Sequence, residues 1–141
     1  MVKKRLQRKR EGLYWLVAGE AKWNPGSNQI YGRWGVPKYL QHVSYTAEGL
    51  KGLLKDGGSK RRAAIAELAK SAGGKLEACY FAFGESDLYC IIEAPDNTSA
   101  AAVALAANAA GAVRIKTTVL LTPEEVDQAT RKSVTFHVPG Q

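Results

Sequence analysis

The stretch from Gly73 to Asn97 constrains the fold more than any other part of the chain, because it contains two β-forming segments around a polar turn. Aromatic, aliphatic and cysteine residues dominate the segments before and after Gly84-Glu85-Ser86-Asp87. These side chains favour strands, whereas glycine, serine and aspartate favour a turn. A turn that pairs Phe83 with Leu88 predicts an antiparallel β-hairpin.

This register divides the hairpin side chains between two faces. We expect one face to meet the helices; it contains Cys79, Phe81, Phe83, Leu88, Cys90 and Ile92. The other face contains Tyr80, Tyr89, Ile91 and Glu93. Cys79 and Cys90 would then be diagonal neighbours roughly 7–8 Å apart at Cα, too far for a disulfide. The sequence therefore predicts two reduced thiols and a cytoplasmic protein.

The segments around the hairpin predict further strands and helices. Residues 37–46 and 112–121 are rich in β-formers and are expected to form strands. Thr46 is a candidate cap for a helix that Gly57-Gly58 interrupts, and Ser59 is a candidate cap for its second part. Gly73-Gly74 is expected to end this helix.

An alanine-rich helix is predicted over residues 98–110. Thr122-Pro123-Glu124-Glu125 has the pattern of a capping box with proline at the first helical position, which predicts an added helix to about Lys132. The resulting β-α-β-β-α-β order predicts an α+β, ferredoxin-like fold with an antiparallel sheet. Its helices would cover one sheet face and leave the other open.

Apolar and aromatic residues are expected on both sheet faces, so a bare open face is not expected. Face-to-face pairing of two copies would give a dimeric α/β barrel with a cleft between sheet and partner. A homodimer or higher homo-oligomer is therefore the expected assembly. No apolar run approaches the length of a membrane span, and no membrane partner is expected.

The net charge of +7 is concentrated at one end of the chain. Residues 1–35 carry a net charge of +6, whereas residues 36–141 carry +1. A nucleic-acid-binding domain would spread its cations over a folded face, so nucleic acid is not expected as a partner of the domain. We expect a disordered basic extension over 1–35, with a short helix in Lys3–Glu11, a domain over 36–133 and an extended tail over 134–141.

Several segments resemble the GYD domain family. They are Val36-Pro37-Lys38-Tyr39-Leu40 through Val43-Ser44-Tyr45-Thr46-Ala47-Glu48-Gly49, Gly73-Gly74-Lys75-Leu76, Tyr80-Phe81-Ala82-Phe83-Gly84, Ala94-Pro95-Asp96 and residues 114–122. The resemblance covers about residues 36–133 and implies a ferredoxin-like, dimeric α/β-barrel fold. It implies little biochemistry. Gly84 and Asp87 of the family's Gly-Tyr-Asp turn are present, but Ser86 occupies the position of the tyrosine.

The resemblance begins at Val36, where family members typically begin with their initiating methionine. We therefore expect residues 1–35 to be a translated upstream segment, with Val36 at the real start. The alternative is a basic arm that contacts nucleic acid or an anionic surface.

Few residues have the pattern of a reaction centre. The sequence contains no P-loop, dinucleotide-binding glycine motif or metal-spaced cysteine cluster, and neither a cofactor nor a metal is expected. His42 is a candidate general base in the cleft, although an ordinary strand histidine is the favoured interpretation. Tyr80 and Tyr89 are candidates for the cleft wall because their polar tips suit such a surface.

Glu93, Arg114 and Lys116 are candidate ligand-binding residues. The two cations alternate along the last strand and suit an anionic ligand, while a solvated strand edge explains them equally well.

Two further motifs have mainly structural interpretations. Gly84 is expected to supply a positive φ, and Asp87 to cap the turn, in preference to catalytic roles. Lys60-Arg61-Arg62 lies at a helix start, where cations oppose the dipole. This suggests either an anion contact or a solvated face, and the solvated face is favoured.

Three functions follow from these observations. The first is a small dimeric protein that binds a small ligand in the sheet cleft. The second is a cofactor-independent, monooxygenase-like enzyme using His42, Tyr80 or Tyr89, because such enzymes share this architecture. The third is binding to nucleic acid or an anionic surface through the basic arm. Whether the protein is an enzyme stays open at this point.

Overall fold

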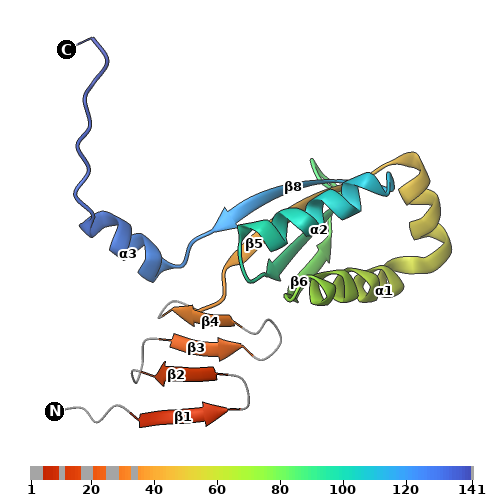
Figure 1. The fold of residues 1–141 in the computed structure, drawn as a ribbon. Helices are drawn as coiled ribbons and strands as arrows, with labels where there is room; N and C mark the ends of the chain where they lie inside the picture. The colour runs from red at the N-terminus through yellow and green to blue at the C-terminus, as the bar shows by residue number, and fades with distance from the viewer. Residues whose placement is uncertain (1–4, 10–11, 17–20, 25–28, 33–34, 141) are drawn as a thin grey trace.

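The computed structural model describes residues 5–9, 12–16, 21–24, 29–32 and 35–140 (Figure 1). Strands β1 (Arg5–Lys9) and β2 (Gly12–Leu16) pair with each other, as do β3 (Ala21–Asn24) and β4 (Gln29–Gly32). The helix predicted near the N-terminus is therefore wrong over residues 5–9; the rest of Lys3–Glu11 lies outside the described residues. The predicted disorder of 1–35 stays a prediction.

The domain is built on one four-stranded antiparallel sheet with the order β6-β7-β5-β8. Its strands are β5 (Lys38–Tyr45), β6 (Lys75–Phe81), β7 (Leu88–Glu93) and β8 (Val113–Leu120). The helices are α1 (Ala47–Ser71), α2 (Asn97–Ala109) and the added α3 (Pro123–Arg131). The predicted β-α-β-β-α-β order with a C-terminal helix is confirmed.

Helix α1 begins and ends as its sequence predicts, but its internal break differs in detail. Thr46 caps the first turn, and Gly57 leaves helical geometry with φ 77° and ψ 168°. The break therefore precedes Ser59, which lies within the second part of the helix and was wrongly predicted as its cap. Gly73 has φ 77°, and the N–H groups of Gly73 and Gly74 bond to the carbonyls of Lys70 and Ala69, which is a Schellman motif.

The other two helices also have strong N-terminal caps. The Asp96 carboxylate accepts the Ser99 N–H at 2.7 Å and starts α2. Thr122 and Glu125 form the predicted capping box at α3, with bonds of 3.2 Å and 2.7 Å. These local bonds satisfy N–H groups that a helix leaves unpaired at its start.

Both α1 and α2 pack on one face of the sheet, which forms the core. Sheet residues Tyr39, Val43, Leu88, Cys90 and Ile92 are buried there, as are Ala69 of α1 and Ala100 and Val103 of α2. The small side chains of α2 let the helix approach the sheet closely. As a result, every second residue of β5 and β7 is buried, and the intervening residues face away from the helices.

The predicted hairpin register is wrong by two residues. Phe81, rather than Phe83, pairs with Leu88, and Cys79 lies directly opposite Cys90. The reason is tertiary: the Asp87 N–H bonds to the Val43 carbonyl at 2.9 Å, and its carboxylate accepts the Tyr45 N–H at 2.8 Å. Asp87 therefore docks on β5 and widens the loop to residues 82–87.

The shift of two residues preserves the division into faces but removes Phe83 from the sheet. Phe83 is fully exposed, and Phe81 is 40% exposed, so neither is the core residue that was predicted. Direct opposition brings the Cys79 and Cys90 side chains within hydrogen-bonding reach of each other. Both thiols are free, as predicted, although they are direct rather than diagonal neighbours.

Helix α3 leaves the domain at the end of β8, and residues 132–140 continue as an extended tail (Figure 1). No residue of α3 is buried, and Val126 is 47% exposed. Within the described residues, no helix combines the length and the apolar character needed to cross a membrane.

Candidate functional site

The candidate site is the sheet face turned away from α1 and α2, which we call the open face. Strand pairing places Leu40 beside Ile91 and Thr118, and His42 beside Tyr89 and Lys116. Tyr80 lies opposite Tyr89, and Lys38 lies opposite Glu93. All six residues singled out in the sequence as catalytic or ligand-binding candidates therefore lie on this one face: His42, Tyr80, Tyr89, Glu93, Arg114 and Lys116.

His42 lies at the centre of the open face and has two side-chain neighbours. Its ring meets the ring of Tyr89 edge-on, with centroids 5.3 Å apart. Its Nε2 lies 3.3 Å from Thr118 Oγ1. The tautomer decides which atom donates. These contacts orient the imidazole and leave it half-buried.

Charged side chains occupy two diagonally opposite corners of the open face. At the corner formed by β6 and β7, Lys38 makes ion pairs with Glu77 and, at 3.1 Å, with Glu93. The hydrogen bond to Glu77 is the largest cause that raises the pKa of Lys38. At the diagonally opposite corner are the two cations of β8: Arg114 lies opposite Ser44, and Lys116 lies opposite His42.

Those two cations differ in their surroundings, although both are exposed. Lys116 lies across from His42 and belongs to the open face alone. Arg114 also borders a surface recess of about 320 Å³ that Thr46, Asn108 and Gly111 line. The Asn108 amide bonds to the Ile115 N–H at 2.8 Å, which protects the edge of β8 from pairing with another strand.

The central turn has a structural role. Asp87 anchors the loop to β5, and Ser86, in the position of the family tyrosine, is buried with 7% of its surface exposed. Gly84 does not adopt the positive φ that was predicted for it. Glu85 is exposed. The turn therefore holds the hairpin in register.

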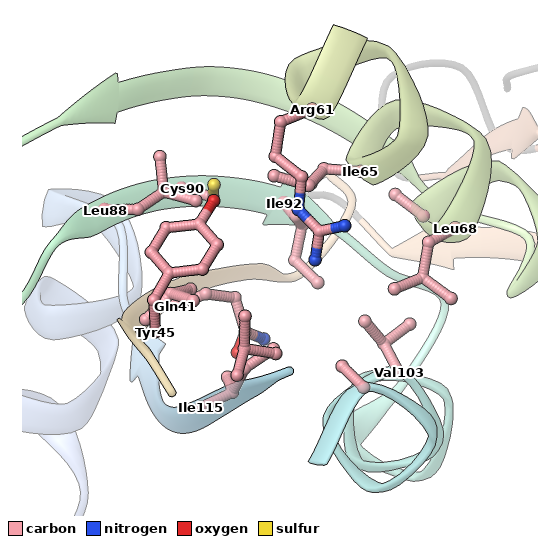
Figure 2. A pocket seen from close by; sticks show the side chains of 14 residues that line it. Gln41, Tyr45, Arg61, Ile65, Leu68, Leu88, Cys90, Ile92, Val103 and Ile115 are labelled. Atoms are coloured by element: carbon pink, nitrogen blue, oxygen red, sulfur yellow. The ribbon is translucent and has the colours of Figure 1, made fainter. Parts of the chain in front are cut away.

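Side chains outside the catalytic and ligand-binding candidates converge on the opposite side of the sheet. Gln41 and Tyr45 of β5 and Arg61 of α1 line a cavity between sheet and helices (Figure 2). The sequence did contain a signal for Gln41. This polar residue lies on the same side of its strand as Tyr39 and Val43, which are buried. For Arg61, the signal was the cationic triplet, for which the sequence favoured a solvated face over an anion contact.

A four-stranded antiparallel sheet in the order β6-β7-β5-β8, covered on one face by two helices, defines a ferredoxin-like α+β domain. The family model described as GYD domain matches residues 39–130, from β5 into α3. The chain therefore belongs to the GYD domain family, and the resemblance noted in the sequence is confirmed. Neither the curated proteins nor the solved structures contain a match.

Proposed function

We propose that this GYD domain protein is a homodimeric α/β barrel that binds a small anionic ligand between two paired open faces. The observation that carries the proposal is the composition of the open face. Leu40, Ala78, Tyr89 and Ile91 form an apolar centre that no element of the same chain covers among the described residues. Apolar surface of this kind marks an interface or a ligand site.

The distribution of charge supports a second copy as the occupant. Glu77 and Glu93 share one corner with Lys38 and Lys75, and Arg114 and Lys116 mark the diagonally opposite corner. A two-fold axis in the interface, perpendicular to this diagonal, brings Glu77 and Glu93 of each copy toward Arg114 and Lys116 of the other. Such self-complementarity is what an isologous dimer requires. The exposed α3 offers further apolar surface to a partner.

The basic half of the open face supports an anionic ligand. Lys116 supplies a cation beside His42, and Thr118 supplies a hydroxyl group and Tyr89 an aromatic ring next to the same imidazole. A small molecule with one anionic group and an apolar body would match the cations at the corner and the apolar centre beside them. The free, directly opposed thiols of Cys79 and Cys90 support a reducing, cytoplasmic location.

Dimerisation is tested by light scattering coupled to size exclusion over a range of concentrations. Ile91→Glu is expected to weaken the dimer by about tenfold or more, because it buries a carboxylate against apolar side chains. Leu54→Glu is the matched control, since Leu54 lies on α1 and is 87% exposed. A wild-type protein that stays monomeric at high concentration would refute the dimer.

Ligand binding is tested with the anionic naphthalene dye ANS, whose fluorescence rises on apolar surfaces. Lys116→Gln is expected to weaken binding several-fold, and Lys55→Gln, on the exposed surface of α1, is expected to leave it unchanged. A chain lacking residues 1–35 should bind as the full chain does. Equal binding by both lysine variants would contradict the anion site, whereas loss on deletion would favour the basic arm.

The enzyme alternative rests on the orientation of His42 by Tyr89 and Thr118 on the same face. A general base needs such an oriented, accessible imidazole. Oxygen uptake with hydroquinone as an electron-rich probe tests it, with His42→Ala expected to abolish uptake. No uptake, or uptake unaffected by His42→Ala, would contradict this alternative.

A further inference from the structure

The segment after α3 has the pattern of a β-strand but forms none in the described structure. In Val134-Thr135-Phe136-His137-Val138, apolar side chains alternate with polar ones, which is the period of a strand with one covered face. Pro139 then ends the pattern. We call residues 133–138 the C-terminal segment. All of it is exposed, and Phe136 is 77% exposed, so its apolar side has no covering surface within the described chain.

Helix α3 directs the C-terminal segment away from its own sheet. The capping box of Thr122 and Glu125 and the proline at the start of α3 fix the direction in which this helix leaves β8. The segment then continues beyond the end of the sheet, and Figure 1 shows the C-terminus away from strands β5 to β8. This direction favours a surface on another molecule.

Strand β8 has such a surface along its outer edge. At Ile115 this edge is closed, because the Asn108 side chain bonds to the Ile115 N–H at 2.8 Å and to its carbonyl at 3.4 Å. Thr117 and Val119 repeat the orientation of Ile115, so their N–H and carbonyl groups also point away from β5. Among the described residues, nothing bonds to these main-chain groups. The edge is therefore open from Thr117 to Leu121.

Exposed apolar side chains line the open edge on the side that α2 covers. Val119 belongs to this side and Leu121 follows it two residues later; both are more than half exposed. Leu105 of α2 is 70% exposed and lies one helical turn before Asn108. Helix α2 runs antiparallel to β8, because its start is bonded to Tyr39, the neighbour of Val119, and Asn108 near its end is bonded to β8. Leu105 therefore lies alongside the open edge.

The opposite edge of the sheet is a poorer acceptor for a strand. The register of β6 shifts between Leu76 and Ala78, and the charged Lys75 and Glu77 lie on the same stretch. Bulges and charges are features that protect edge strands from pairing. The open edge of β8 is therefore the preferred acceptor.

The C-terminal segment and the open edge of β8 match in length and in chemistry. The alternating stretch spans residues 134–138, and the edge spans residues 117–121. A strand that adds to an edge gains affinity from main-chain hydrogen bonds and specificity from its alternate side chains. The apolar side of the segment matches Leu105 and Val119, and its polar side matches the polar open-face side chains of β8.

We propose that the C-terminal segment adds as a strand to the β8 edge of a second copy, which returns its own segment in the same way. This exchange depends on the dimer proposed above, whose two-fold axis runs along the other diagonal of the open face. That diagonal ends at the end of β8, so the β8 ends of the two copies face each other there. Sheets packed face to face lie about 10 Å apart, and the nine residues of α3 span roughly 13 Å. Helix α3 is therefore long enough to carry the segment across.

Hydrogen exchange of the full-length protein, measured by mass spectrometry over the concentrations at which light scattering follows the dimer, tests the pairing. Peptides from residues 132–140 are expected to be protected about tenfold or more in the dimer and to lose this protection as it dissociates, since hydrogen-bonded amides exchange slowly. Protection that is independent of concentration would mean pairing within one chain and would overturn the exchange. An unprotected segment in a dimer would also overturn it and leave the open-face dimer standing, whereas a protein that is monomeric throughout would refute both.

Two substitutions at exposed positions test whether the pairing is between copies. Phe136→Glu damages the segment and Leu105→Glu damages the edge, and each is expected to weaken the dimer about tenfold, whereas Leu54→Glu is expected to leave it unchanged. In a mixture of the first two variants, the intact segment of Leu105→Glu chains meets the intact edge of Phe136→Glu chains. The unaltered segment peptide, which differs in mass from the variant peptide, should then regain its protection. Absence of this recovery would overturn the exchange between copies.

Discussion

The same substitution at two glycines of α1 is expected to change stability in opposite directions. Gly49 is buried in the first turn of the helix, where a Cβ atom would lie 1.8 Å from the Ala112 carbonyl oxygen and 3.0 Å from Tyr45 Cδ1. Gly52 is exposed in the next turn, and a Cβ there would meet nothing within 4 Å. Alanine is normally favoured over glycine in a helix by about 1 kcal/mol.

At Gly49 the clash is with backbone, which cannot rotate away. Relief requires α1 to separate from the start of β8, and this breaks the bond from the Thr46 N–H to the Ala112 carbonyl, 3.1 Å long. It also strains the bond from the Thr46 hydroxyl to the Gly111 carbonyl, 2.8 Å long. Overpacking costs about 1–3 kcal/mol and one lost hydrogen bond about 1 kcal/mol, from which the helical preference for alanine is subtracted.

Gly49→Ala is therefore expected to lower the free energy of unfolding by about 1–3 kcal/mol, whereas Gly52→Ala is expected to raise it by about 0.5–1 kcal/mol. For a domain near 100 residues, 1 kcal/mol shifts Tm by roughly 4–8 °C. Urea unfolding followed by circular dichroism, with thermal unfolding as a second measurement, separates the two variants. If Gly49→Ala is as stable as the wild type, the close packing of α1 on the Ala112 carbonyl is not present in solution.

Three further outcomes follow from single contacts. Asp87→Ala is expected to lower the free energy of unfolding in urea by about 1.5–3 kcal/mol, since the Tyr45 N–H loses a charged acceptor. Asp87→Asn should lower it less. An Asp87→Ala variant as stable as the wild type would refute the anchoring role. Gly57→Ala should cost about 1–3 kcal/mol because φ 77° with ψ 168° is a glycine conformation, and a stabilised variant would mean that α1 has no break. Burial raises the pKa of Cys90 to about 12, so the thiol loses its proton at a lower pH in the unfolded state than in the folded state. The free energy of unfolding should therefore fall as the pH rises from about 9 to 12. Cys90→Val, measured alongside by urea unfolding, should show a smaller fall.

Local sequence patterns predicted the elements well, because their causes are local. Thr46 and the Thr122–Glu125 capping box begin their helices through bonds to residues only three positions away. Gly57 breaks α1 and Gly73 ends it because each requires a backbone conformation that other residues avoid. The six candidate residues share the open face because alternation along a strand survives a register shift of two.

The sequence by itself determined the order of elements in the domain after residue 36, the faces of its strands and the family. Only the tertiary structure decided that Asp87 bonds to β5, which widens the hairpin loop and places Cys79 opposite Cys90. Likewise, only the packing of α1 on the sheet brings Arg61 onto the same cavity as Gln41 and Tyr45. Periodicity depends on neighbours in the chain, whereas register and convergence depend on contacts between residues far apart in sequence, and no local pattern encodes these.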